Sequence, residues 1–146
     1  NEGLKAARAI AMLSYRNYIT YQTTQTDADE KADNFKAASY QQHQGNKLAK
    51  RFNAYSYYTL SKAMDSHNLA RGKNKNTEAV LQTIKARACC IGLNTDILFP
   101  VSEQIFLAQH IPNAEYNEMD SLYGHDGFLL EFQQLNNILH KFLKPA

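Results

Sequence analysis

Residues 1–74 carry the hydrophobic and polar periodicity of helices. In GLKAARAIAMLSYRNYITYQ, residues 3–22, apolar side chains recur every three to four positions, which predicts an amphipathic helix. The polar stretch 23–46, of mixed charge, predicts a short exposed helix or a loop. A second strong helical pattern, rich in tyrosine, covers residues 47–70, and RGKNKN at 71–76 predicts a solvated loop behind it.

From residue 75 onward the pattern changes to alternating helices and strands. The predicted order is a helix with Thr77 as N-cap (77–86), a strand buried on both faces (87–94), a helix with Ser102 as cap (102–111), an alternating strand (114–120) and a closing amphipathic helix (127–144) with Phe128, Phe132, Leu135, Leu139 and Phe142 on one stripe. This order is typical of right-handed crossovers over a parallel sheet. Two strands cannot complete such a sheet, so we expect the rest of it to lie elsewhere.

Composition excludes several classes of protein. The 146 residues are 44% hydrophobic and 21% charged, which is typical of a globular chain that can bury a core. A net charge of +2 with interspersed signs argues against nucleic acid or a membrane surface as partner, and no apolar run reaches the length of a membrane span. Cys89 and Cys90 are sequence neighbours, so we expect reduced thiols and a cytoplasmic protein. The chain begins with Asn1 instead of methionine, and we expect it to be part of a longer polypeptide.

Two polar groups follow the two predicted strands. Asp96 lies in NTDILFP after the first strand, and His125 lies in SLYGHDGF after the second. Because the carboxyl ends of parallel strands meet at one edge of a sheet, we expect these side chains to meet although 29 residues separate them (125 − 96). A carboxylate beside an imidazole fixes its tautomer and stabilises its protonated form, as a general base requires. Each residue alone also fits a structural role: Asp96 in a turn before Pro100, and His125 as a loop histidine.

The order of acid and histidine is that of α/β-hydrolases, in which a serine on a Gly-x-Ser-x-Gly elbow precedes both. The six glycines of the chain include no two that are four residues apart, so this elbow is absent from the sequence. We therefore expect the nucleophile to lie before Asn1.

Four segments carry a resemblance to a known family: GLKAARAIAMLSYR, FNAYSYYTLSKAMDSHNLARG, IGLNTDILFP and YGHDGFL. Together they resemble homoserine O-acetyltransferase, an acyl-CoA-dependent α/β-hydrolase-fold enzyme of methionine biosynthesis. The resemblance implies an α/β fold, with a helical lid at 1–74 and the C-terminal portion of the core at 75–146. It also implies ping-pong transfer of acetyl from acetyl-CoA, a co-substrate and not a permanently bound cofactor, to L-homoserine. The implied partners are the N-terminal portion of the same protein and a second copy bound through the lid helices.

The resemblance assigns roles to three residues near the strand ends. Asp96 matches the acid of the catalytic triad and His125 matches its base. Asp126 matches the acid that receives the homoserine ammonium, and a carboxylate beside a catalytic base suits that charge.

Two residues of the first helix match substrate-binding positions. Arg8 matches the arginine that holds the homoserine carboxylate, for which a planar guanidinium is well shaped, and Arg16 is its rival for the anion. Tyr15, two helical turns after Arg8 on the same face, matches a tyrosine that contacts substrate, although packing within the lid explains it equally well.

Several alternatives stay open at the level of sequence. The chain could be an inactive remnant that serves as a folding or binding module, the acyl donor could be succinyl-CoA, and the acceptor could be serine. No His or Cys spacing fits a metal site, so we expect none.

Overall fold

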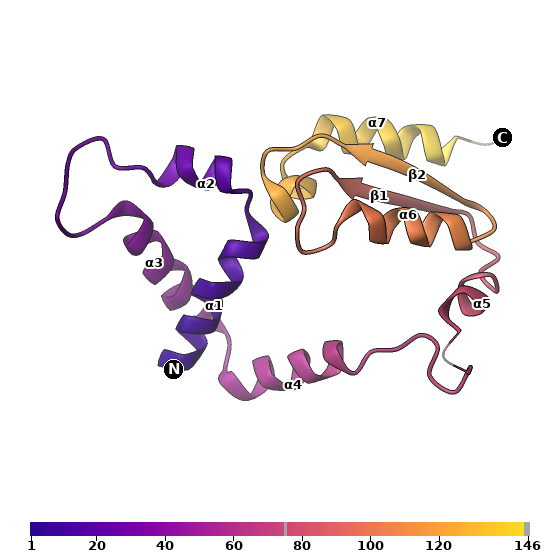
Figure 1. The fold of residues 1–146 in the computed structure, drawn as a ribbon, viewed down its shortest axis with the longest axis horizontal. Coiled ribbons are helices and arrows are strands. Elements are labelled where there is room, and N and C mark those ends of the chain that lie inside the picture. Colours follow the sequence, from indigo (N-terminus) through magenta and orange to yellow (C-terminus); the bar gives the residue numbers. More distant parts are fainter. Residues whose placement is uncertain (75, 145–146) are drawn as a thin grey trace. The chain divides into compact units, whose positions relative to one another are not determined.

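The protein forms two compact units, residues 1–67 and 68–146, which we call the first and second unit (Figure 1). The computed structural model describes residues 1–74 and 76–144. Of the predicted loop at 71–76, the described residues up to Asn74 form turns, and Lys75 lies outside the described residues. The division into a lid at 1–74 and a core at 75–146 stays a prediction.

The first unit is helical. Its elements are α1 (Glu2–Tyr15), α2 (Tyr18–Gln25), α3 (Lys36–Arg51) and α4 (Ala54–Asp65). Leu4 and Met12 of α1 and Leu48 of α3 are buried where these helices pack. The close approach depends on Gly45, because a Cβ there would lie 2.9 Å from the carbonyl oxygen of Lys5. A helix glycine is therefore used here for packing and not for a turn.

Two predicted long helices are each divided in the structure. The helix predicted at 3–22 ends at Tyr15, because Asn17 caps α2 by accepting a hydrogen bond from the Ile19 amide at 2.8 Å. The helix predicted at 47–70 is divided in the same way by Asn53, whose Oδ1 accepts from the Ser56 amide at 2.8 Å. Asparagine favours the N-cap over the helix interior, since its side chain competes for nearby amides.

The second unit contains the predicted parallel sheet. Its elements are α5 (Thr77–Leu81), β1 (Ala88–Leu93), α6 (Val101–His110), β2 (Ala114–Met119), the 3₁₀-helix η1 (Gly124–Leu129) and α7 (Phe132–Leu143). The strands β1 and β2 pair in parallel from Ala88 opposite Ala114 to Leu93 opposite Met119, as predicted. Both strands therefore end at the same edge of the sheet, where Figure 1 shows the loop after β1 and η1 side by side.

The helices α6 and α7 lie against different faces of this sheet. On the face of α6, a Cβ at Gly92 would lie 3.1 Å from Cγ1 of Val101. Leu135 of α7 instead lines a cavity together with Leu93 and Met119, which point the other way. Met119 and Leu81 are the most completely buried large side chains.

The predicted starts of three helices of the second unit need correction. The cap of α5 is Asn76, which accepts from the Ala79 amide at 2.8 Å, and not Thr77. The cap position of α6 is Pro100, with Ser102 already inside the helix. The closing helix begins at Phe132 and not at residue 127, so Phe128 lies in η1 and is not part of its stripe.

Candidate active site

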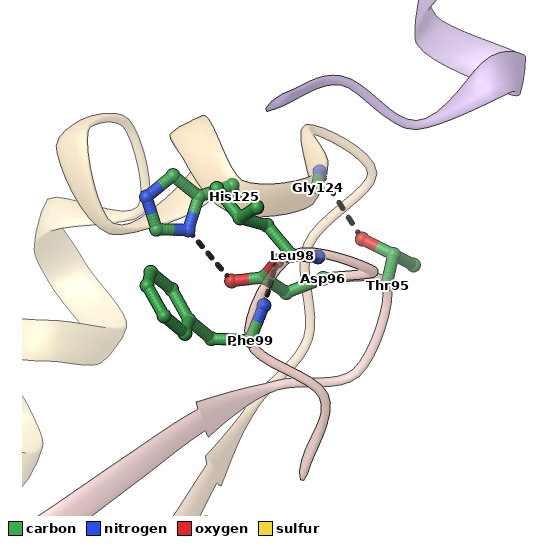
Figure 2. A network of polar contacts seen from close by, with 6 residues as sticks. All are labelled: Thr95, Asp96, Leu98, Phe99, Gly124 and His125. Atoms are coloured by element: carbon green, nitrogen blue, oxygen red, sulfur yellow. Dashed lines mark hydrogen bonds and ion pairs between the residues drawn. The ribbon is translucent and has the colours of Figure 1, made fainter. Parts of the chain in front are cut away.

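Asp96 and His125 meet at the carboxyl ends of the two strands. Asp96 lies in the turn after β1, and His125 lies in the first turn of η1 after β2. The Nδ1 atom of His125 lies 2.8 Å from Oδ2 of Asp96 (Figure 2). The proximity predicted from strand order is thus present, and we call this pair the dyad. Its catalytic role stays a prediction.

The Asp96 carboxylate uses both of its oxygens. While Oδ2 faces the imidazole, Oδ1 accepts hydrogen bonds from the amides of Leu98 at 2.8 Å and Phe99 at 3.0 Å. Its side chain is only 3% exposed. Asp96 therefore lies in the turn before Pro100 and also contacts His125, because this turn aims the second carboxylate oxygen at the histidine. A carboxylate accepts from Nδ1–H, which leaves Nε2 as the basic nitrogen.

The imidazole of His125 contacts two aromatic rings. The ring centroids of Phe99 and Phe128 are 5.2 Å and 5.5 Å from that of the histidine. Figure 2 shows Nε2 on the side of the ring turned away from Asp96. A cavity of about 250 Å³ adjoins the dyad and is lined mainly by apolar side chains, among them Leu93 and Met119. The arrangement fits a general base that works next to an apolar space.

The two glycines around the histidine have separate structural reasons. Gly124 has φ +62°, in the left-handed region that glycine adopts readily. Gly127 is buried, and a Cβ there would lie 2.3 Å from Cδ2 of Leu93 and 2.5 Å from Oγ of Ser121. The first glycine turns the chain into η1, and the second lets η1 settle against the strand ends, which presents His125 to Asp96.

Polar side chains that sequence reasoning did not select join the two loops of the site. Asn94 donates from Nδ2 to Oδ1 of Asp120 at 2.7 Å and accepts from the Ser121 amide at 3.1 Å. The hydroxyl of Thr95 contacts both Ser121 and Gly124. The signal available in the sequence was their position, directly between the end of a buried strand and the candidate acid.

The other predicted site residues are distributed over both units. Asp126 follows His125 in η1 and is half-buried. Arg8 and Tyr15 lie on α1 of the first unit, where the Arg8 guanidinium carbon is 5.1 Å from the Tyr15 ring centroid. The predicted shared helical face is therefore present. Arg16, the rival of Arg8, lies over the Tyr40 ring at 5.3 Å. All substrate-binding roles stay predictions.

Other reactive groups of the second unit fit structural positions. Cys89 and Cys90 are free thiols, and burial raises the pKa of both. A protonated, buried thiol is a poor nucleophile. Within residues 1–74 and 76–144, no three His, Cys, Asp or Glu side chains are grouped so that they could hold a metal ion. In the same ranges, every helix is too short or too polar to span a membrane.

Comparison with known proteins identifies homoserine O-acetyltransferases that are similar to nearly the whole chain. No family model matches the chain. The homoserine O-acetyltransferase of Cyclobacterium marinum is 50% identical over 141 residues, which are 97% of this chain and 40% of the relative. That of Chlorobium chlorochromatii is 42% identical over 146 residues, covering 98% of this chain and 41% of the relative. The chain thus spans about two fifths of the length of the curated relatives that it matches.

Solved structures agree on the fold. The homoserine O-acetyltransferase of Staphylococcus aureus superposes with a TM-score of 0.75 at 30% identity, covering 99% of this chain and 42% of that one. The enzyme from Bacillus anthracis has a TM-score of 0.83 at 21% identity, and the match covers 99% of this chain and 41% of that one. Esterase E22 superposes with a TM-score of 0.77 at 18% identity, and the match covers 97% of this chain and 42% of the esterase. At this identity the similarity shows the fold alone. The predicted fold class is confirmed: the chain is a homologue of part of the homoserine O-acetyltransferases and has part of their α/β-hydrolase fold.

Proposed function

We propose that the chain is the lid and acid–base portion of an acyltransferase that moves acetyl from acetyl-CoA to the hydroxyl of L-homoserine. The observation that carries the proposal is the 2.8 Å contact between His125 Nδ1 and Asp96 Oδ2 at the ends of two parallel strands. The similarity to homoserine O-acetyltransferases supports the choice of reaction, because the fold itself is shared with an esterase.

The reaction divides into two half-reactions on one serine. His125 takes the serine proton at Nε2 while the hydroxyl attacks the thioester, and it then protonates the departing CoA thiolate. In the second half-reaction, His125 deprotonates the homoserine hydroxyl, which attacks the acyl carbon. The ester bond to the serine then breaks, and His125 returns the proton to the serine oxygen. Asp96 holds the Nδ1–H tautomer and stabilises the imidazolium in both steps. Asp126 would bind the homoserine ammonium, Arg8 would bind its carboxylate, and Tyr15 would contact the substrate.

The nucleophile belongs, in this proposal, to an upstream portion of the same protein. Support comes from the order of acid and histidine, from the two-fifths coverage of the relatives, and from β1, which in the described residues pairs through one edge only. An unpaired edge is a place for a further strand. The upstream portion would also supply the oxyanion hole.

We extend the proposal to a homodimer formed through the helices of the first unit. Large apolar side chains on these helices are exposed, namely Ile10, Leu13, Tyr55, Tyr58 and Met64. Exposed apolar groups of this size are typical of contact surfaces between proteins. Light scattering on the native protein checks the dimer, and a monomeric mass would contradict it.

The test of the proposed function follows CoA thiol release and acyl-product formation in two proteins. The native full-length protein should transfer acetyl from acetyl-CoA to L-homoserine, and His125→Ala should abolish the transfer. The 146-residue chain alone should be inactive, because in this proposal the nucleophile and the oxyanion hole lie in the upstream portion. Activity of the chain alone that His125→Ala removes would contradict an upstream nucleophile.

Parallel assays decide between the related reactions. Succinyl-CoA in place of acetyl-CoA tests the donor, and L-serine in place of L-homoserine tests the acceptor. Thiol release that continues over many turnovers without any amino acid would identify a hydrolase. Intact-mass analysis of the native protein that finds only these 146 residues would favour a binding or folding module instead.

A further inference from the structure

The hydroxyl of Thr95 connects the loop of the acid to the loop of the histidine. Its Oγ1 donates to the carbonyl oxygen of Ser121 at 2.6 Å and accepts from the Gly124 amide at 3.2 Å (Figure 2 shows the second bond). Thr95 directly precedes Asp96, and Gly124 directly precedes His125. One side chain beside the acid therefore holds two backbone groups of the loop that carries the base.

Threonine is chemically suited to this double contact. A hydroxyl carries one proton and two lone pairs, so it can donate to one group and accept from another at the same time. The branched β-carbon restricts the rotation of the side chain about χ1. Serine could form both hydrogen bonds with more rotational freedom, whereas valine, which has nearly the same shape, could form neither.

The loop after β2 needs such a fixed point because its backbone is not set by local preference. Gly124 adopts φ +62°, but glycine enters either sign of φ with nearly equal ease. Its amide is held by Thr95, and the following residue then reaches Asp96 at 2.8 Å. Asn94 reinforces the same connection through Ser121 and Asp120. The two residues before the acid thus continue the contact between β1 and β2 past the ends of the strands.

We propose that Thr95 is a positioning residue for His125: its hydroxyl joins the two loops and keeps the imidazole within hydrogen-bond distance of Asp96 through the catalytic cycle. Thr95 touches neither substrate nor reacting atoms in this proposal and acts only through the dyad. The catalytic consequence rests on the proposed function, whereas the geometric consequence concerns the dyad alone.

The kinetic test compares three variants of the native full-length protein. Thr95→Val removes both hydrogen bonds, Thr95→Ser keeps them, and Thr83→Val is the matched control. Thr83 is a threonine of the same unit whose hydroxyl also donates to a backbone carbonyl, that of Val80, at 2.7 Å. We expect Thr95→Val to lower kcat by about ten- to a hundred-fold, the effect of a small displacement of a catalytic group, with KM for homoserine nearly unchanged. Thr95→Ser should restore most of kcat, and Thr83→Val should match the parent.

A pH profile distinguishes positioning from simple loss of stability. Weakening the contact with Asp96 removes stabilisation of the imidazolium, so the acid limb of kcat/KM should move to lower pH in Thr95→Val. A destabilised but correctly built site would lose amplitude without this shift. Thr95→Val with the parental kcat and profile, or a Thr95→Ser enzyme as defective as the valine variant, would overturn the proposal.

A second readout does not depend on acyl transfer. With isotope-labelled histidine, the Nδ1–H proton of His125 should give a low-field resonance, assigned by its loss in His125→Gln. We expect this resonance in the parent, Thr95→Ser and Thr83→Val, and its loss through solvent exchange in Thr95→Val. Retention in Thr95→Val overturns the positioning role. If the parent transfers no acyl group, the proposed function fails and this resonance alone decides the role of Thr95.

Discussion

Gly127 lies so close to Ser121 that a Cβ at the glycine would be 2.5 Å from the serine Oγ. The same Cβ would lie 2.3 Å from Cδ2 of Leu93, so a side chain at position 127 would clash with both neighbours. Gly127→Ala should therefore displace η1 and lower the free energy of unfolding by about 1–3 kcal/mol, as overpacking does. Urea unfolding measures the change, and acyl transfer should fall with it because η1 carries His125.

Gly3→Ala is the control for this substitution. Gly3 lies in α1 with nothing within 4 Å of a Cβ built there. Alanine is favoured over glycine in a helix by about 0.5–1 kcal/mol, so this variant should be slightly more stable than the parent. A Gly127→Ala protein with the stability of Gly3→Ala and full activity would show that the approach of η1 to the strand ends is not required.

Arg8 and Arg16 can be separated as candidates for the substrate carboxylate. Arg8→Ala should raise KM for homoserine by about ten- to a hundred-fold, because a hydrogen bond to a charged group contributes about 1.5–3 kcal/mol. Arg16→Ala removes a guanidinium stacked on Tyr40, and we expect lower stability with little change in KM. Steady-state kinetics at varied homoserine measures both. A raised KM in Arg16→Ala alone would transfer the role to Arg16.

Tyr116 contributes to the stability of the second unit, and this contribution is lost at high pH. Burial, followed by the hydrogen bond from its hydroxyl to Glu118 at 2.8 Å, raises the pKa of Tyr116 to about 12. A raised pKa means that the folded state holds the proton more tightly than the unfolded state. The contribution is therefore complete below about pH 10, the ordinary tyrosine pKa, and is lost as the pH rises toward 12.

The measurement for Tyr116 combines two titrations. Phenolate absorbance of the folded protein should show one tyrosine that ionises late, and Tyr116→Phe should remove it. Unfolding of the parent should become easier with rising pH by a greater margin than unfolding of Tyr116→Phe. Identical alkaline titrations of the two proteins would contradict the raised pKa.

The alternating part of the chain was predictable because its pattern is simple. An apolar run of strand length at residues 88–93 and an alternating pattern at residues 114–119, separated by a helical stretch, allow little other than a parallel pair. In the first unit, periodicity alone hid the breaks at Asn17 and Asn53. A single side-chain oxygen can end a helix there, because it satisfies an amide that the helix would otherwise use. The spacing of apolar residues does not indicate where such a capping hydrogen bond forms.

In the candidate site, too, the sequence pattern predicted the order of the elements but, apart from the dyad, not the contacts between their side chains. Strand order was sufficient to bring Asp96 to His125, since it fixes which loops are neighbours. The part played by Thr95 and the tight fit of Gly127 depend on distances between atoms of different loops. Those distances follow from how the loops pack, and a single sequence does not encode them in any local spacing.

The two acids of the site should fail at different steps when each is changed to its amide. Asp96→Asn keeps the shape of the turn but removes the acceptor for Nδ1–H, which leaves the imidazole in the wrong tautomer and lowers kcat by about 10⁴-fold. Asp126→Asn removes a negative charge proposed to bind the homoserine ammonium, a loss of about 2–5 kcal/mol in acceptor binding.

Formation of the acyl-enzyme does not involve that ammonium. In a single turnover of the native full-length protein without homoserine, Asp126→Asn should therefore release a burst of free CoA close to that of the parent, while Asp96→Asn should release none on the same timescale. Addition of homoserine should then start steady turnover in the parent, whereas Asp126→Asn should need a much higher homoserine concentration. If Asp126→Asn abolishes the burst as completely as Asp96→Asn does, Asp126 acts on the dyad itself and not on the acceptor amine.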